Sequence, residues 1–191
     1  GIMRIENGTD LSRRDFFKYG TAGIAAACGM PAAGLMGKAA AAAPTRIPIA
    51  VQLYSVRFEC EKDLPRTLAG IGKMRYQAVE FAGYYSRSAG ELRKMLDGNG
   101  LKCAGTHIDL ATLRGDNLTK TVEFNQILGN KLLIVPGLSP KMTATRQGWR
   151  EAAKIFDELA EKVKPHGMRV GYHNHTIEFQ PLDGELPWDT F

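Results

Sequence analysis

Short apolar runs alternate with amphipathic segments throughout the chain after Pro44, and this alternation limits the fold more than any other feature. Successive apolar runs begin roughly 25 to 37 residues apart, which leaves room for a helix between each pair. Such spacing predicts βαβ units and a parallel sheet. The expected strands are Ile47–Tyr54, Ala78–Phe81, Lys102–His107, Leu132–Val135 and Arg169–His173.

Helices are predicted between these strands. The clearest covers Trp149–Lys164, where apolar residues recur at the helical period along one stripe. Another begins at Ser88 with Glu91 three residues later, the spacing of a capping box. A third begins near Pro65, in the first turn where proline is tolerated. A fourth, less regular, covers Asn117–Leu128.

Two α/β architectures fit this order of elements, a doubly wound open sheet and a (β/α)₈ TIM barrel. No glycine-rich phosphate loop follows the first strand, where Tyr54-Ser55-Val56-Arg57 stands instead, so dinucleotide binding is disfavoured. A complete barrel takes about 250 residues. Residues 44–191 supply 148 positions and five strands. We therefore expect a TIM barrel of which only about the first five β/α units are present.

The N-terminal segment has the pattern of an export signal. Arg13 and Arg14 stand in a twin-arginine motif, a mildly apolar stretch follows, and Ala39–Ala43 suits a cleavage site. The alternative is an alanine-rich helix of the domain itself. We expect residues 1–43 to be the signal, residues 44–191 the domain, and the periplasm its destination. Lipid anchoring at Cys28 is not expected. The three residues before it, Ala25-Ala26-Ala27, do not include the Leu that is usual in a lipid-attachment motif.

Charge and hydropathy exclude some partners. The formal net charge is +5 for the whole chain, and residues 44–191 hold 20 Lys and Arg against 17 Asp and Glu. These charges are mixed, without a basic run, so nucleic acid is not expected as a partner. No strongly apolar stretch after the signal is long enough to span a membrane. The sequence leaves open whether the protein forms a homo-oligomer.

Polar and aromatic residues gather where the predicted strands end. In a βα-barrel the loops after the strands converge on one mouth, which carries the chemistry. We therefore expect one shared site formed by Gln52, Tyr54, Glu80, Tyr84, Tyr85, His107, His173, His175 and Glu178. Asp109 also follows a strand, and it is expected to cap the next helix.

Several of these residues have a structural as well as a functional interpretation. His173 and His175 are two apart on a strand and so face the same side, where they could chelate one divalent metal or form a structural pair. Glu80 could serve the site or pair with a basic neighbour. The two tyrosines could stack on a sugar ring or cover the barrel rim. Glu178 could bind substrate, exchange a proton or be a loop carboxylate.

The strand-end motifs resemble the xylose isomerase-like barrel group, the sugar phosphate isomerase/epimerase superfamily that also includes AP endonuclease family 2. The resemblance covers residues 46–191 and identifies the superfamily only. It rests on Val51-Gln52-Leu53-Tyr54-Ser55-Val56-Arg57, Val79-Glu80-Phe81-Ala82-Gly83-Tyr84-Tyr85, Gly105-Thr106-His107 and Gly171-Tyr172-His173-Asn174-His175 with Glu178-Phe179.

This resemblance implies a metal-dependent carbohydrate isomerase or epimerase that abstracts a proton next to a sugar carbonyl. His173 would be a ligand of Mn, Zn, Co or Mg, with the remaining ligands beyond Phe191, so the chain alone is expected to be inactive. The interpretation makes Glu80, His107 and Glu178 catalytic. The residues expected to bind substrate are Gln52, Tyr54, Tyr84, Tyr85 and His175.

Three alternatives remain open at this point. Members of the superfamily commonly have Glu where this chain has His173, so a keto-sugar lyase or dehydratase of the same superfamily is as consistent as an epimerase. A non-catalytic, exported sugar-binding barrel would have a degenerate site. A DNA-repair endonuclease is disfavoured by the expected export and by the absence of a basic surface in the sequence.

Overall fold

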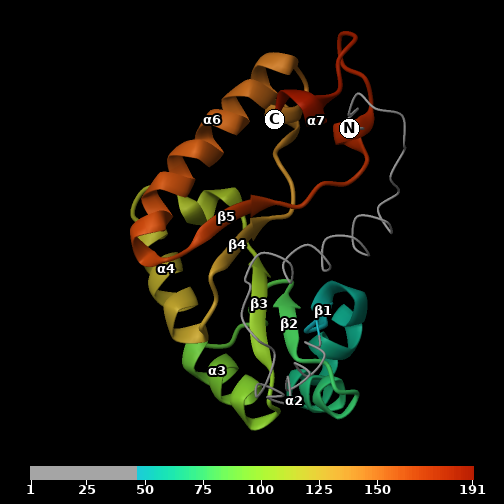
Figure 1. Cartoon of the computed structure of the whole chain (residues 1–191), viewed down its shortest axis with the longest axis vertical. Helices are drawn as coiled ribbons and strands as arrows, with labels where there is room; N and C mark the ends of the chain where they lie inside the picture. The colour runs from blue at the N-terminus through green and yellow to red at the C-terminus, as the bar shows by residue number, and fades with distance from the viewer. Residues whose placement is uncertain (1–46) are drawn as a thin grey trace, which may run out of the picture. The chain divides into compact units, whose positions relative to one another are not determined.

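The computed structural model describes residues 47–191, so the predicted export signal lies outside the described residues. Five strands form one parallel sheet in the order β1-β2-β3-β4-β5, as Figure 1 shows. The α/β prediction is therefore confirmed. The strands are β1 Ala50–Gln52, β2 Ala78–Phe81, β3 Lys102–His107, β4 Leu132–Val135 and β5 Arg169–Tyr172.

The strand order distinguishes the two architectures left open by the sequence. Each strand pairs with the next one along the chain, without a reversal of direction across the sheet. A doubly wound sheet has such a reversal at its switch point, whereas a (β/α)₈ barrel adds its strands consecutively. The five strands thus have the order of successive barrel strands, and within residues 47–191 the sheet does not close.

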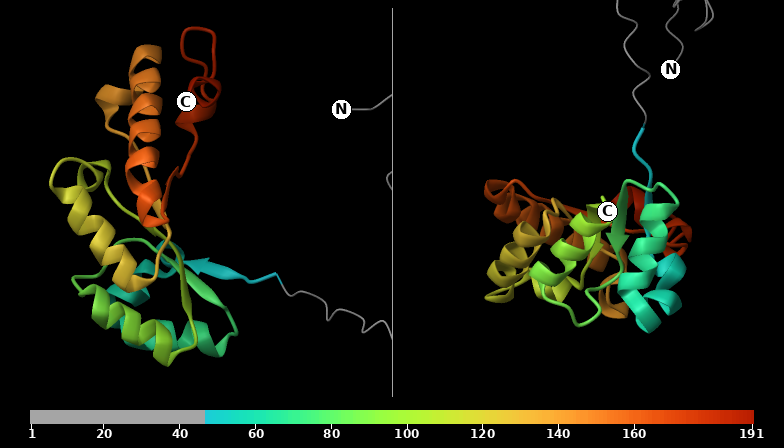
Figure 2. Two further views of the ribbon diagram at one scale, coloured as in Figure 1. Left: turned by 60° about the vertical axis from the view of Figure 1, so that its left-hand side comes forward. Right: turned by 90° about the horizontal axis from the view of Figure 1, so that it is seen from below.

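Helices connect the strands and pack along one face of the sheet (Figure 2). Neighbouring helices contact each other in chain order, as α2 does α3 and α3 does α4. The α-helices are α2 Arg57–Lys73, α3 Ala89–Gly98, α4 Asn117–Leu128, α5 Pro140–Thr143, α6 Arg146–Val163 and α7 Pro187–Thr190. Short 3₁₀ helices are η1 Leu53–Val56, η2 Leu110–Leu113, η3 Lys164–His166 and η4 Ile177–Phe179. No helix in this range is long and apolar enough to cross a membrane.

The start of α3 confirms the predicted capping box. The Ser88 hydroxyl accepts a hydrogen bond from the Glu91 backbone N–H at 3.3 Å. The Glu91 carboxylate accepts one from the Ser88 backbone N–H at 2.9 Å. These bonds satisfy two donors that a helix N-terminus would otherwise leave unpaired.

The first strand is shorter than predicted. The sequence pattern predicts Ile47–Tyr54, but β1 ends at Gln52 and a 3₁₀ turn begins at Leu53. Leu53 is fully buried in the helix–sheet core, and the turn brings it there. The apolar run therefore includes a residue buried by a turn, which alternation alone does not distinguish from a strand.

Helix α2 begins earlier than predicted and contains a break. Asp63 leaves helical geometry, with φ −159° and ψ 85°, and divides the segment into two helical parts. Its carboxylate accepts a hydrogen bond from the Arg66 N–H at 3.0 Å, so it caps the second part. Pro65 then lies in the first turn of that part, as the sequence predicts.

The core lies between the helices and one face of the sheet, in two adjoining clusters. Val79 and Phe81 of β2 are fully buried and point into the first cluster. Glu80 lies between them in sequence, and because side chains alternate along a strand it faces the opposite side. The buried members of the second cluster are Ile108, Leu113, Val122, Leu133, Val135, Phe156, Leu159, Val163 and Met168.

Candidate active site

The strand register places a row of functional residues on the face of the sheet away from the helices. Gln52 pairs with Glu80 across β1 and β2, and Glu80 pairs with Gly105 across β2 and β3. His107 in turn pairs with Ile134 of β4. Because paired positions in neighbouring strands point to the same face, these residues form one continuous inner surface.

A β-bulge makes this alignment possible. Val79 pairs with Cys103, yet the next residue, Glu80, pairs with Gly105, so Ala104 is an extra residue in β3. The bulge reverses the alternation of side chains along β3. Cys103 therefore packs into the helix-side core, where burial raises its pKa to about 12, while Gly105 lies on the inner face.

Gly105 leaves the space that the Glu80 side chain uses. A Cβ atom at this position would lie 3.4 Å from Glu80 Oε2 and 2.9 Å from Ile134 Cδ1. The second distance is shorter than real Cβ contacts allow, so an alanine here would require the Ile134 side chain to move, whereas the first distance is an ordinary contact. The absence of a side chain at position 105 thus leaves the Ile134 side chain and the Glu80 carboxylate unobstructed.

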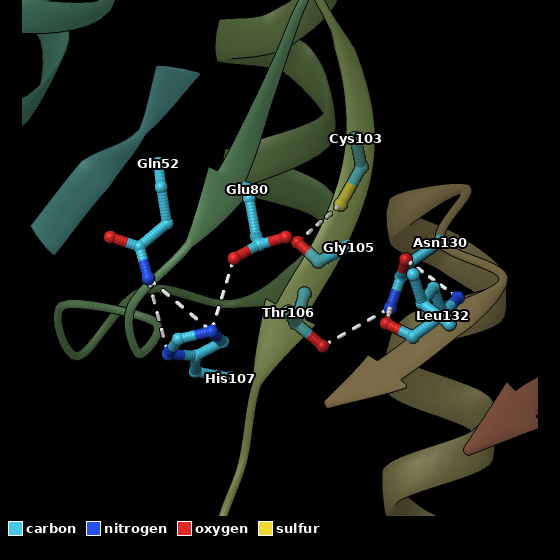
Figure 3. Close-up of polar contacts among 8 residues, drawn as sticks. All are labelled: Gln52, Glu80, Cys103, Gly105, Thr106, His107, Asn130 and Leu132. Atoms are coloured by element: carbon cyan, nitrogen blue, oxygen red, sulfur yellow. Dashed lines mark hydrogen bonds and ion pairs between the residues drawn. The ribbon is translucent and has the colours of Figure 1, made fainter. Parts of the chain in front are cut away.

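Glu80 and Gln52 both point toward the His107 ring (Figure 3). His107 Nε2 lies 3.0 Å from Glu80 Oε1, and the two side chains are 10% and 25% exposed. The Gln52 side-chain nitrogen lies 3.4 Å from His107 Nδ1 and 3.3 Å from Nε2. A carboxylate only accepts hydrogen bonds, so the proton of a neutral His107 belongs on Nε2, and Nδ1 is then an acceptor.

The surroundings of His107 favour its neutral form. Burial lowers the pKa of His107 below its ordinary value, and this is the largest influence. The Glu80 carboxylate opposes the shift, whereas the neighbouring His173 and His175 rings add to it. A neutral imidazole supported by a carboxylate is the form that accepts a proton in general-base catalysis.

The strand-end residues open into a pocket of about 540 Å³. Six of the nine predicted site residues line it, namely Gln52, Tyr54, Tyr84, His107, His173 and His175. Glu80 lies directly behind His107. The expectation of a shared mouth therefore holds geometrically for most of the set, although their roles stay predictions.

The three histidines of the pocket form a chain of ring contacts. The His107 and His173 ring centroids are 4.9 Å apart, and so are those of His173 and His175. Both pairs meet edge to face, at 66° and 67°. His173 is held by its main-chain N–H, which donates to Val135 O at 3.0 Å, just beyond the end of β5. The fifth strand itself ends one residue earlier than predicted.

Tyr54 and Tyr84 expose fewer groups to a ligand in the pocket than the sequence predicts. One face of the Tyr54 ring is covered by the Arg57 guanidinium, 4.3 Å from the ring centroid. The Tyr84 hydroxyl is turned into the protein, where it accepts a hydrogen bond from Asn125 Nδ2 at 2.9 Å and lies 3.4 Å from Thr106 Oγ1. Burial raises the pKa of Tyr84. Its ring, and not its hydroxyl, is thus available to a ligand.

Three predicted site residues are absent from the residues that line the pocket, namely Glu80, which contacts His107, and Tyr85 and Glu178. Tyr85 has φ +51° and points into a separate cavity beside Cys60. Glu178 is 1% exposed, and its carboxylate accepts hydrogen bonds from the Tyr172 hydroxyl and from the His175 main-chain N–H. Burial raises the pKa of Glu178, but the Tyr172 hydroxyl and nearby main-chain N–H groups outweigh it, so the net shift is downward.

Other lining residues were not foreseen, and one was misassigned. Asp109 lines the pocket and occupies the N-cap position of η2, but its side chain makes no capping hydrogen bond, so that prediction is wrong. Pro136 follows β4, and the strand-end rule could have found it. Thr121 comes from helix α4, where no sequence signal marks it. The unforeseen lining residues are Ala82, Gly83, Ile108, Thr112, Thr121 and Pro136.

The pocket contains ligand types that a divalent metal prefers, but too few of them converge at one point. Imidazole nitrogens and carboxylate oxygens are suitable ligands for Zn, Mn and Co. Within residues 47–191, however, no three His, Cys, Asp or Glu side chains converge to hold an ion. The described residues therefore do not form a coordination sphere by themselves.

Solved structures share this fold. A sugar phosphate isomerase/epimerase from Parabacteroides distasonis ATCC 8503 matches with a TM-score of 0.58 and 24% identity, over 71% of this chain and 53% of that one. An AP endonuclease of family 2 from Brucella melitensis matches with a TM-score of 0.51 and 18% identity, over 66% of this chain and 55% of that one. At such identities the likeness establishes the fold alone.

This chain spans about half the length of these two solved structures. No model of a known protein family matches the sequence, and no curated protein matches it. The described residues thus form a parallel α/β sheet with the fold of sugar phosphate isomerase/epimerase and AP endonuclease family 2 structures. Its pocket lies at the carboxyl ends of the strands.

Proposed function

We propose that the whole protein is a carbohydrate isomerase or epimerase that moves a proton next to a sugar carbonyl, and that this chain supplies part of its active site. The observation that carries the proposal is the Glu80–His107 contact of 3.0 Å beside the pocket. A carboxylate that orients a neutral imidazole is a recurring arrangement for general-base catalysis. The strand-end location supports it too, since barrel enzymes place their chemistry there.

In this proposal His107 takes the proton from the carbon next to the carbonyl. Its Nδ1 is the acceptor nitrogen once Nε2–H donates to Glu80, and a substrate takes the place of the Gln52 amide that lies 3.4 Å from it. Glu80 then stabilises the imidazolium that forms. Gln52, whose amide already lies within 3.4 Å of the ring, orients His107 or a sugar hydroxyl. His175 is the most exposed of the three imidazoles and contacts the hydroxyls of the sugar.

A divalent metal is a second part of the proposal. His173 lines the pocket and is half-buried, which suits one ligand of Mn, Zn, Co or Mg. A bound metal would polarise the sugar carbonyl and make the neighbouring proton more acidic. Proton abstraction is also the first step of elimination, so a keto-sugar lyase is the second candidate. His173, in place of the acidic ligand implied by the resemblance, favours it.

The test is hydrogen exchange in D₂O with the whole protein. We expect L-ribulose, D-fructose or a keto-inositol to gain deuterium at the carbon next to the carbonyl, measured by proton NMR. His107→Ala should slow this exchange by about 100-fold or more, and His166→Ala, on the exposed turn η3, should leave it unchanged. Binding without any exchange would overturn the enzymatic proposal and favour a sugar-binding protein. Equal exchange in His107→Ala would remove His107 from the base role.

The place of action follows from the N-terminal pattern. The twin-arginine motif around Arg13 and Arg14 supports the proposal that the protein works in the periplasm. A fusion of residues 1–43 to a reporter that requires folded export would test this. Replacing both arginines with lysine should then keep the reporter in the cytoplasm.

A further inference from the structure

The segment that follows β5 carries both His173 and His175, and two hydrogen bonds donated by its main chain hold it in place. The first is the His173 N–H, which donates to Val135 O at 3.0 Å. The second is the His175 N–H, which donates to Glu178 Oε2 at 2.8 Å. Between them the chain has left the sheet and makes no further ladder bonds, so the second bond fixes where His175 lies.

Glu178 is itself held in place by a hydrogen bond on its side nearest the core. Its other oxygen accepts a hydrogen bond from the Tyr172 hydroxyl. The Tyr172 ring packs edge to face with Trp149 and Phe156, at centroid distances of 6.3 Å and 6.0 Å, and it is partly buried against the second core cluster. The His175 segment is therefore connected through one carboxylate to the rigid aromatic core.

The location of Glu178 does not suit direct chemistry. It is 1% exposed, whereas the pocket is lined by the histidines and not by this carboxylate. One of its oxygens is engaged by Tyr172 and the other by the His175 N–H. A buried carboxylate with both oxygens bonded in this way orders its neighbours and has no oxygen directed to a ligand in the pocket.

We propose that Glu178 is a positioning residue, which holds the His173–His175 segment against the core through Tyr172 and sets the place of the two imidazoles. Only the catalytic use of the two imidazoles rests on the proposed function. The positioning itself can be measured without substrate or metal.

The test compares Glu178→Ala, Glu178→Gln and Tyr172→Phe by NMR, in metal-free protein. The readouts are the hydrogen exchange of the His175 amide and the imidazole signals of His173 and His175. Glu178→Ala should speed exchange of that amide by about tenfold or more, since a bond to a charged acceptor is lost, and shift both sets of imidazole signals. Glu178→Gln should keep most of the native pattern, because its oxygen can accept from His175 and its NH₂ can donate to the Tyr172 oxygen.

Two controls keep the proposal falsifiable. Glu158→Gln, on the exposed face of α6, should change none of these signals. Tyr172→Phe keeps the ring in the core and removes one bond, so it should give an intermediate effect even if Glu178→Ala fails to fold. Native exchange and imidazole signals in both Glu178→Ala and Tyr172→Phe would overturn the proposal. So would Glu178→Gln behaving like Glu178→Ala. A protein that passes this test but exchanges no sugar proton would refute the proposed function alone.

Discussion

His107 Nε2 and Glu80 Oε1 lie 3.0 Å apart, on neighbouring strands and on the face of the sheet opposite the helices. The contact depends on the register that follows a one-residue bulge in β3, where Gly105 lies beside the Glu80 carboxylate. It joins two residues that are 27 positions apart in the sequence (80 and 107), so it forms only in the register that β2 and β3 adopt.

Replacing Glu80 should change which nitrogen of His107 carries the proton. In the native protein we expect the Nε2–H tautomer, because the carboxylate accepts that proton's hydrogen bond. Glu80→Gln can offer His107 either its oxygen or its NH₂ group, so the variant should show a mixture of the two tautomers. Nitrogen-15 shifts of the His107 ring measure this. A native ring protonated on Nδ1 would contradict the account.

Adding a methyl group at Gly105 should disturb the packing on the inner face of β3, next to Glu80 and Ile134. Gly105→Ala places a Cβ 2.9 Å from Ile134 Cδ1, the far end of a flexible side chain that can rotate away, so we expect the free energy of unfolding to fall by no more than about 1 kcal/mol. The matched control is Gly70→Ala in α2, where a Cβ meets nothing within 4 Å. Alanine is the better helix former, so this control should gain about 0.5–1 kcal/mol. Urea denaturation measures both, and equal stabilities of the two variants would contradict the packing described here.

The capping box of α3 should make stability sensitive to acid. The Ser88 backbone N–H and then its hydroxyl hold the pKa of Glu91 below its ordinary value of 4.5. A carboxyl with a lowered folded pKa stabilises the protein above the unfolded value, and this stabilisation is lost as the pH falls through the folded pKa. The stability advantage of the native protein over Glu91→Gln should therefore be present at neutral pH and shrink below about pH 4.5.

Urea midpoints across the acid range measure this difference. Ser88→Ala should lower the free energy of unfolding by about 1 kcal/mol at neutral pH, and it should bring the pKa of Glu91 back toward its ordinary value. If Glu91→Gln and the native protein differ equally at every pH, the carboxylate is not engaged as described.

Metal binding should depend on His173. Isothermal titration of the whole protein with Zn²⁺ and Mn²⁺ is expected to show at least about tenfold weaker binding in His173→Ala, since even residues that only orient a ligand contribute that much. His166→Ala is the matched control. His166 lies on the exposed turn η3 before β5, whereas His173 follows β5 at the end of the strand where the pocket lies. Unchanged affinity in His173→Ala would remove this residue from the proposed ligands.

Local patterns predict much of this fold. The bounds of β2, β3 and β4 agree with the predicted strands, and β2 and β4 are short, largely buried apolar runs. Helix α3 begins where its capping box predicts. The strand-end rule also gathered Gln52 and the three pocket histidines, since the carboxyl ends of parallel strands meet at one edge.

Features set by tertiary packing could not be predicted in this way. Tyr84 and Tyr85 are adjacent in sequence, yet the positive φ of Tyr85 turns it into a different cavity. The burial of Glu178 depends on Tyr172 and the aromatic core, which no local pattern encodes. The bulge at Ala104 is equally invisible in the sequence, although it decides which residues of β3 face the site.

The shared pocket is the central claim, and imidazole NMR during a sugar titration tests it most directly. On addition of L-ribulose, D-fructose or a keto-inositol, we expect the ring signals of His107, His173 and His175 to shift together with one midpoint, while His166 stays unchanged. Separate midpoints for the three pocket rings, or no shift with any of these sugars, would contradict it.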